Sequence, residues 1–369
     1  MAGRSAVRSP EGSHVLAAAA CGVDGFIRGF GADPDLVLGE AGVDHRLLED
    51  PKAALPLARY VAMMEQAARR TFNDEFGLWF GQQFRPEDLG LIGQLALAAP
   101  DIATGLAAFA RHFVLHQQNT ETRLMRESGL FRLEYRIVDP AIWARRQDAE
   151  LTMGMFANLL RRALGCRAEF EEVWFEHPGP ARPAAHEAAF GAPIFFNAPS
   201  NAIVFRLDDP GKTMPARDIA RFAAIGEELR LIGGTASIGL LPRVLGEIRG
   251  HLPEGAPPIE AVAERLGLAR WTLQRRLAQH GVTYSDCVAE VRRRLSLIHL
   301  ADPSLSVAAI AELLGYSEIS AFSRACRRLH GAPPEAVRRR LVHEHQKNRT
   351  GEATPDRTAR RNHPATMGA

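Results

Sequence analysis

The stretch that decides the fold of the carboxyl-terminal third is AAIAELLGYSEISAFSRACRRLHG, residues 308–331. Its apolar spacing predicts a helix, a tight turn at Gly315 and a second helix with Ser and Arg on one face. A related pattern, EAVAERLGLARWTLQRRLAQHG, occupies residues 260–281, and its Gly267 precedes Gly315 by 48 residues. Each copy has the spacing of a helix-turn-helix, whose second helix enters a DNA major groove. The repeat therefore predicts a protein that reads two grooves of one duplex.

The first copy separates into an inner and an outer face. The residues expected to pack inward are Ile259, Val262, Ala263, Leu266, Leu273 and Leu277. Trp271, Gln274 and Arg275 follow i, i+3, i+4 spacing and share the outer face. Arg can donate two hydrogen bonds to guanine, Gln can pair with adenine, and Trp can pack on a thymine methyl group or a sugar. The alternative is a Trp that covers the core beside two solvated polar residues.

The second copy repeats this design. The residues expected to pack inward are Val307, Ile310, Ala311, Leu314, Phe322 and Ala325. The outer face is expected to hold Ile319, Ser320, Ser323 and Arg324. Ser317 is a good N-cap residue for the second helix. Arg327 and Arg328 are better placed for phosphate than for bases, although an ordinary charged helix surface would carry the same residues.

One helix is expected to join the two motifs, over residues 285–301. Seventeen residues at the usual rise give a strut of about 25 Å, suited to two recognition helices near adjacent major-groove faces. Residues 259–340 hold thirteen Arg, no Lys and eight Asp or Glu, a local excess of five positive charges in a chain of net charge +2. This excess suits phosphate contact, and a solvated helical surface would show it too.

The pattern along the chain predicts an α+β amino-terminal regulatory domain followed by an all-α domain with two helix-turn-helix motifs. The segments that we expect are a weakly ordered N-terminus (1–23), a ligand-sensing and dimerisation domain (24–207), a linker with a helix (208–234), the DNA-binding domain (235–342) and a disordered tail (343–369).

Periodicity gives the expected elements of these segments. Helices are expected over 56–72, over 101–116 with an Asp101 cap, and over 145–164, 216–232 and 237–250; a short helix should end at Gly191. Strands are expected over 120–127 and 130–138, joined at Ser128-Gly129, and then over 169–177, 193–196 and 201–207. In the second strand of this hairpin, apolar Leu133, Tyr135 and Ile137 alternate with charged residues.

A small ligand would be held by polar groups beside apolar segments. The candidates are His112, His116, Gln117, Arg146, Asp148 and Glu150. Asp148 or Glu150 can pair with an ammonium group, and Arg146 with a carboxylate. The competing interpretation is structural, since acidic residues in a first helical turn favour the helix dipole.

The remaining motifs argue against secretion, metal binding and catalysis. VLAAAACG (15–22) resembles a short signal-peptide core, but an alanine-rich helix or disordered lead is the favoured interpretation, so we expect a cytoplasmic protein without a membrane span. The four cysteines show neither CxxC spacing nor a metal-ligand interval to His. No common hydrolase, metalloprotease or nucleotide-binding motif is present, so we expect neither an enzyme nor a cofactor.

With these motifs in hand, residues 259–340 resemble the DNA-binding domain of the AraC/XylS family of bacterial transcription regulators. AELLGYSEISAFSRACRRLHGAPPEAVRR (311–339) is close to that family's second half. The resemblance implies base contacts or phosphate contacts from Trp271, Thr272, Gln274, Arg275, Ile319, Ser320, Ser323, Arg324 and Arg327. Three positions depart from the family pattern: Ala269 replaces a usual capping Ser, Ile319 a common polar residue, and Cys326 a common Phe.

Residues 24–207 resemble the arabinose-binding-type regulatory domain of such regulators, through FGLWFGQQF, LGLIGQLALAAP and FGAPIFFNAPSNAIVF. The resemblance implies a homodimer that senses an amino acid, an amine or another small metabolite, binds double-stranded promoter DNA and activates transcription by contacting RNA polymerase. Two alternatives remain: a regulatory domain that only dimerises or contacts a protein, and an alkyl-transfer sensor that uses Cys21 or Cys166.

Overall fold

The computed structural model describes residues 13–139, 141–165, 168–180, 183–232, 239–303 and 305–341. The chain forms two compact units, residues 1–291 and 292–369, and the division falls inside a helix. Within the described residues, no helix combines the length and the apolar character needed to cross a bilayer. The expected tail, 343–369, lies outside the described residues.

A five-stranded sheet with the strand order β3-β4-β7-β5-β6 lies at the centre of the first unit. Its strands are β3 Thr120–Glu127, β4 Leu130–Ile137, β5 Phe170–Trp174, β6 Ile194–Phe195 and β7 Asn201–Arg206. β3 and β4 pair antiparallel with Glu127 opposite Leu130. Ser128 and Gly129 both have positive φ, 50° and 84°, as a type I′ hairpin turn requires. The predicted hairpin is therefore confirmed.

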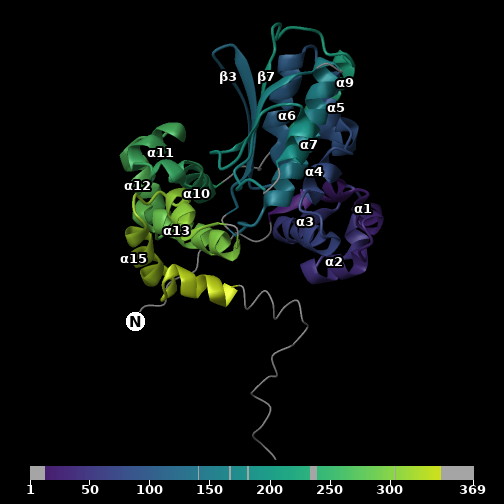
Figure 1. Ribbon diagram of the computed structural model, residues 1–369. Helices are drawn as coiled ribbons and strands as arrows, with labels where there is room; N and C mark the ends of the chain where they lie inside the picture. The colour runs from purple at the N-terminus through teal and green to yellow at the C-terminus, as the bar shows by residue number, and fades with distance from the viewer. Residues whose placement is uncertain are drawn as a thin grey trace, which may run out of the picture. The chain divides into compact units, whose positions relative to one another are not determined.

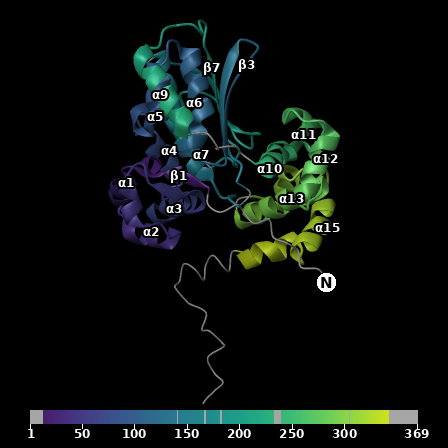
Figure 2. The same ribbon diagram turned by 180° about the vertical axis from the view of Figure 1, so that it is seen from behind.

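Helices cover one face of this sheet (Figures 1 and 2). The helices of the regulatory part are α1 Val23–Gly29, α2 Pro34–Ala41, α3 Leu57–Thr71, α4 Phe76–Gly81, α5 Leu91–Ala98, α6 Ile102–His116, α7 Arg146–Leu164, α8 Ala184–Phe190 and α9 Ile219–Ile232, with 3-10 turns at Ala17–Ala20, His45–Leu48 and Pro86–Leu89. On β4, Leu133 and Tyr135 are buried beside α7, while the alternate residue Arg136 points to the opposite face. The sheet thus offers its second face to another element.

The amino-terminal segment corrects one prediction. We expected residues 1–23 to be weakly ordered, but β1 (His14–Leu16) pairs antiparallel with β2 (Ala54–Pro56), and Val15 is fully buried. The alanines of 17–20 are buried as well. The expectation is therefore wrong for residues 13–23, because a partner strand about forty residues away provides the order that the local sequence lacks. Residues 1–12 lie outside the described residues.

The segment expected to be a linker packs on the regulatory domain. Ile102 donates its backbone N–H to Lys212, and Met214 is buried. The expected helix 216–232 is present as α9, in which Ile225 and Leu229 are buried. The Arg221 guanidinium of α9 donates to the Gln94 side-chain oxygen of α5 over 3.0 Å. Contacts with the regulatory core therefore continue past residue 207, as far as Leu229 of α9.

The carboxyl-terminal third is helical, and the predicted fold class is confirmed for both parts of the chain. Its elements are α10 Leu240–His251, a 3-10 turn Leu252–Glu254, α11 Ile259–Arg265, α12 Arg270–Gln279, α13 Tyr284–Ala301, α14 Val307–Leu313 and α15 Ile319–His330. The joining helix that we expected over 285–301 is α13. α13 ends at Ala301, and Pro303 follows two residues later. Proline cannot continue a helix, which explains the end of α13 here.

Candidate nucleic-acid interface and effector site

The first helix-turn-helix consists of α11 and α12. Gly267 has φ +67° between them, a conformation that favours glycine, and the Leu268 N–H donates back to Ala263 over 2.8 Å. Leu273 and Leu277 of α12 are buried, as predicted. Ala269 stands at the N-cap of α12 without a side-chain hydrogen bond. The core, rather than a cap, fixes this helix.

The outer face of α12 is open to solvent. Trp271 is 62% exposed, so it does not cover the core as the alternative interpretation required. The Arg275 guanidinium lies 5.0 Å above the Trp271 ring, a cation–π geometry that orders both side chains. Gln274 is exposed beside them and Thr272 is half-buried. The four residues of α12 that are expected to contact DNA therefore share its outer face, and the Trp271 indole and the Arg275 guanidinium are both exposed there.

The second helix-turn-helix consists of α14 and α15. Gly315 has φ +67°, and Ile310, Ala311, Phe322 and Ala325 are buried as predicted. Arg292 stabilises the turn: it donates to the carbonyl oxygens of Leu314 and Gly315, each over 3.1 Å, and lies 4.4 Å above the Tyr316 ring. Sequence reasoning missed Arg292, because the residues that it contacts are more than twenty positions away.

The start of α15 differs from the prediction. We expected Ser317 to cap it, but the N-cap residue is Glu318, whose side chain caps no backbone N–H. The Ser320 hydroxyl instead donates to the Glu318 carboxylate over 2.8 Å. Ser317 lies one residue too early to cap, because the helix begins only at Ile319.

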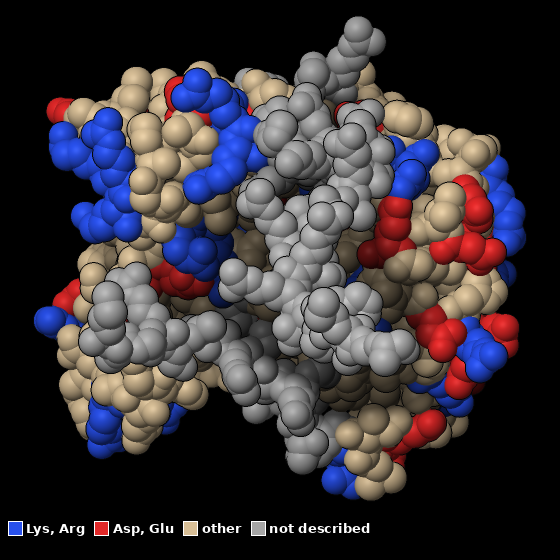
Figure 3. All heavy atoms as spheres, turned by 90° about the horizontal axis from the view of Figure 1, so that it is seen from below, with Lys and Arg blue, Asp and Glu red and all other residues tan. Residues whose placement is uncertain are grey.

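The outer face of α15 carries the remaining predicted contacts. Ile319 is 50% exposed, and Ser320, Arg324 and Arg327 are exposed, whereas Ser323 is half-buried. Basic side chains also occur elsewhere on the molecule, in separate groups among acidic ones on the face drawn in Figure 3. The chain as a whole carries only +2, so net charge by itself marks no DNA-binding face.

The structure brings two of the predicted ligand residues together in the regulatory core. Gln117 donates its side-chain amide to the Tyr135 hydroxyl over 2.7 Å and to Asp148 over 3.3 Å. The Tyr135 hydroxyl in turn donates to Asp148 over 2.6 Å. Burial raises the pKa of Asp148 to about 6 and also raises the pKa of Tyr135. These groups satisfy one another, which is the usual arrangement of a buried polar network.

A second cluster surrounds Glu150, which is fully buried. Its Oε1 accepts from Arg146 over 2.7 Å, and His186 Nε2 and His177 Nε2 lie 2.9 and 3.4 Å away. Burial opposes ionisation of Glu150, but the His186 hydrogen bond and the neighbouring charges outweigh it and lower the pKa. Burial lowers the pKa of His177 to about 4. The two histidines lie about thirty positions from Glu150, and no local pattern in the sequence marks them.

Polar atoms without a hydrogen-bond partner among the described residues gather in this second cluster. Four of the unpartnered buried atoms belong to this cluster, namely Glu150 Oε2, His177 Nε2, His186 Nδ1 and Arg146 Nη2, and the others lie elsewhere in the described residues. Unsatisfied buried polar atoms are uncommon in native proteins, and water or a ligand is a usual explanation. His112 belongs to neither cluster, because its Nδ1 lies 2.8 Å from the Ala108 carbonyl of its own helix. The described residues hold no group of His, Cys, Asp and Glu suited to a metal.

His116 gives a testable pH dependence. Burial lowers the pKa of His116 to about 4, and neither ring nitrogen has a partner among the described residues. The unfolded chain takes up this proton near pH 6.5, so stability is lost as pH falls from about 6.5 to 4. Replacing His116 by Leu removes this loss. The difference in unfolding free energy, His116→Leu minus wild type, should therefore be about 3 kcal/mol larger at pH 4 than at pH 7 when both are measured by urea unfolding. A difference that stays constant over that range would contradict this assignment.

Two cysteines of the DNA-binding part, Cys287 and Cys326, are buried. Burial raises the pKa of Cys287 to about 12 and also raises that of Cys326, which disfavours the nucleophilic thiolate. Cys21 is exposed. Cys166, the other candidate for alkyl transfer, lies outside the described residues.

Two helix-turn-helix motifs behind an α+β domain define the class of this protein as a DNA-binding transcription regulator. Residues 31–213 match the arabinose-binding domain of AraC transcription regulators, N-terminal, and residues 262–340 match a helix-turn-helix domain family. The chain belongs to the AraC/XylS family of transcriptional regulators that carry an amino-terminal arabinose-binding-type domain.

Relatives of similar length support this membership. The HTH-type transcriptional regulator VirS of Mycobacterium tuberculosis is 31% identical over 337 residues, which cover 89% of this chain and 97% of that protein. The ornithine utilization regulator of Pseudomonas aeruginosa is 24% identical over 313 residues, covering 84% and 91%. Among solved structures, the transcriptional regulator CdpR from Pseudomonas aeruginosa aligns with a TM-score of 0.40 and 22% identity, covering 83% of this chain and 96% of that chain.

Proposed function

We propose that this regulator is an activator that binds a promoter site through the outer faces of α12 and α15. The observation that carries the DNA contact is the exposed Trp271–Arg275 pair on α12, since an outward-facing indole of this kind has no role in the core. The proposed contacts are Trp271, Thr272, Gln274, Arg275, Ile319, Ser320, Ser323, Arg324 and Arg327. Footprinting the promoters next to the gene with the full chain tests this proposal, and protection no better than on random DNA would contradict it.

Removing one arginine from either face should weaken binding to the footprinted site. Arg275→Ala and Arg324→Ala should each cost about 1–3 kcal/mol of specific affinity, with the fold retained, because a bidentate contact to a base edge is lost. Fluorescence anisotropy with a labelled promoter fragment and random competitor measures this loss. Arg28→Ala removes an exposed arginine of α1 and serves as the matched control. Unchanged affinity in both reader variants would mean that these faces are wrongly assigned.

We infer that the regulatory domain senses an amino acid or an amine. Glu150 and Arg146 support this ligand class, since they offer a carboxylate and a guanidinium side by side with unpartnered polar atoms. The printed name of one relative, an ornithine utilization regulator, is consistent with it. A thermal-shift screen with ornithine, other amino acids, polyamines and sugars tests the inference, since a ligand that binds only the native state raises the melting temperature.

A second candidate is a regulatory domain that dimerises without a metabolite. One observation favours it: Gln117, Tyr135 and Asp148 already satisfy one another in the core. α9 also exposes Leu231 and Ile232, 71% and 58% exposed, which suits a homodimer contact. A dimer in light scattering, with no thermal shift from any compound in the screen, would favour this alternative.

Activation is tested with purified RNA polymerase. The expected result is more transcript from the footprinted promoter when the regulator is added, since family members contact the polymerase. Less transcript would make the protein a repressor.

A further inference from the structure

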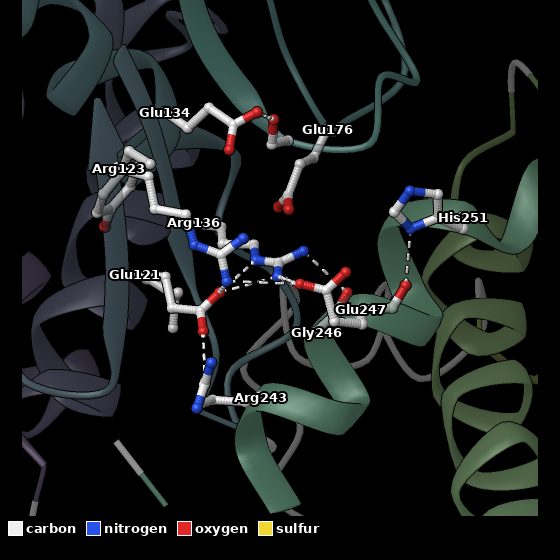
Figure 4. A network of polar contacts seen from close by, with 12 residues as sticks. Glu121, Arg123, Glu134, Arg136, Glu176, Arg243, Gly246, Glu247 and His251 are labelled. Atoms are coloured by element: carbon white, nitrogen blue, oxygen red, sulfur yellow. Dashed lines mark hydrogen bonds and ion pairs between the residues drawn. The ribbon is translucent and has the colours of Figure 1, made fainter. Parts of the chain in front are cut away.

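A buried charge cluster joins the regulatory sheet to α10, the helix that precedes the first helix-turn-helix (Figure 4). From the sheet, Arg136 donates to Glu121 over 2.8 Å and also contacts Glu247 of α10. From the helix, Arg243 donates to Glu121 over 3.1 Å. The Gly246 carbonyl accepts from Arg136 over 3.2 Å. Glu121, Arg136 and Glu247 are all buried, so the cluster belongs to an interface rather than to a solvated surface.

Each side of this interface supplies both signs of charge. Glu121 and Arg136 lie directly opposite each other on β3 and β4, whereas Arg243 and Glu247 are i and i+4 on α10, where such a pair can form along the helix. If α10 left the sheet, each carboxylate would keep a guanidinium within reach on its own element. Ion pairs of this kind gain little net free energy on burial, because desolvation offsets their attraction. The interface is therefore suited to reversible docking.

Two glycines let α10 approach the regulatory domain closely. A Cβ at Gly250 would lie 2.5 Å from the Pro199 carbonyl oxygen, and a Cβ at Gly246 would lie 3.1 Å from Val138 Cγ1. Glycine in a helix interior disfavours the helix. Gly246 lies in the interior of α10, and its close contact with the sheet explains why glycine stands there. The close steric fit and the buried ion pairs thus independently indicate that α10 docks specifically on the regulatory sheet.

We propose that Glu121, Arg136, Arg243 and Glu247, with Gly246 and Gly250, form a reversible charge latch that restrains the first helix-turn-helix. α10 contacts α11, so a docked α10 ties the first DNA-reading motif to the regulatory sheet. A promoter that can be bound only after this motif has left the sheet is bound only by molecules whose latch is open. The apparent affinity for that promoter is then the intrinsic affinity multiplied by the open fraction. The latch makes the regulatory sheet an inhibitor of its own DNA-binding domain.

A disulfide that holds the latch closed tests this proposal in the full chain. The variant carries Val138→Cys and Gly246→Cys in a Cys21→Ser/Cys166→Ser background. A Cβ at Gly246 would lie 3.1 Å from Val138 Cγ1, which is one bond from the Val138 Cβ, so the two Cβ atoms lie close to the usual span of a disulfide, about 3.5–4.5 Å. Thiol titration and peptide mass spectrometry report bond formation independently of DNA binding. We expect the oxidised protein to bind the footprinted promoter at least about tenfold more weakly than the same protein after reduction.

The converse variant opens the latch. Arg243→Glu places a second carboxylate beside Glu121, and because Arg243 is a third exposed the change is compatible with folding. We expect promoter affinity to rise about three- to tenfold and hydrogen exchange of the α10 amides to accelerate. Arg217→Glu, an exposed site outside the cluster, makes the same charge change. It should not raise affinity, because added negative charge by itself weakens DNA binding.

Three outcomes would overturn the latch. The first is a cysteine pair that fails to oxidise although circular dichroism shows a native fold, since α10 would then not dock on the sheet. The second is an oxidised protein that binds the promoter as tightly as the reduced one, or more tightly. The third is an Arg243→Glu protein whose affinity matches that of Arg217→Glu. A wild type that binds no promoter contradicts the proposed promoter site instead, and oxidation of the cysteine pair still reports docking in that case.

Discussion

Gly81→Val should destabilise the regulatory domain by about 3 kcal/mol or more, because it wedges α4 away from α7. A Cβ at Gly81 would lie 2.3 Å from the Leu151 carbonyl oxygen, and one at Gly77 would lie 2.1 Å from that of Gln147. Both obstacles are backbone atoms of α7, so rotation of a side chain cannot relieve the clash. Urea unfolding followed by circular dichroism measures the loss as a lower transition midpoint.

The control for this substitution is a glycine in an open position. Gly39 lies in α2 with nothing within 4 Å of the site where a Cβ would be. Gly39→Ala should leave the domain as stable as the wild type or stabilise it by about 0.5–1 kcal/mol, since alanine favours helix. If Gly81→Val unfolded at the same urea concentration as Gly39→Ala, the close crossing of α4 and α7 would be disproved.

Glu150→Leu should cost about 3–5 kcal/mol at neutral pH, because it removes the buried carboxylate that contacts Arg146, His177 and His186. Arg146 and His186 both lie within 3 Å of Glu150 Oε1. Because the pKa of Glu150 is lowered, its ionised form stabilises the fold above about pH 4.5, and this contribution is lost as pH falls through the folded-state pKa. Urea unfolding at pH 7 measures the cost.

The same variant separates a structural role of Glu150 from a role in effector binding. Glu187→Leu makes an identical change at an exposed position of α8 and should alter stability by less than about 0.5 kcal/mol. A Glu150→Leu protein with wild-type stability would refute the structural role. If that protein had also lost the thermal shift caused by the effector, Glu150 would be a ligand contact instead.

The elements that the sequence predicted well are those with local causes. The hairpin turn at Ser128-Gly129 and the turns at Gly267 and Gly315 need positive φ, and the residues at these positions tolerate it. The outward orientation of Trp271 and Arg275 follows from helical spacing alone. Each of these features depends on residues within one turn of helix or one hairpin, and so the sequence marks it directly.

The predictions that failed, and the residues that were missed, depend on distant partners. Val15 is buried because β2 pairs with β1, and nothing in VLAAAACG indicates that strand. Arg292 stabilises the turn before α15 from another helix. His177 and His186 reach Glu150 from beyond the end of α7. Local periodicity carries no information about such contacts, since they form only when the packed core brings the segments together.

The sequence by itself determined the double helix-turn-helix and its two outer faces, because helical periodicity and glycine turns are properties of neighbouring residues. Only the tertiary structure decided which charges are buried. Glu121 and Glu247 lie 126 positions apart, yet both meet Arg136. A buried charge is tolerated only beside its counter-charge. The partner of each charge is set by how sheet and helix pack, which the order of residues along the chain does not show.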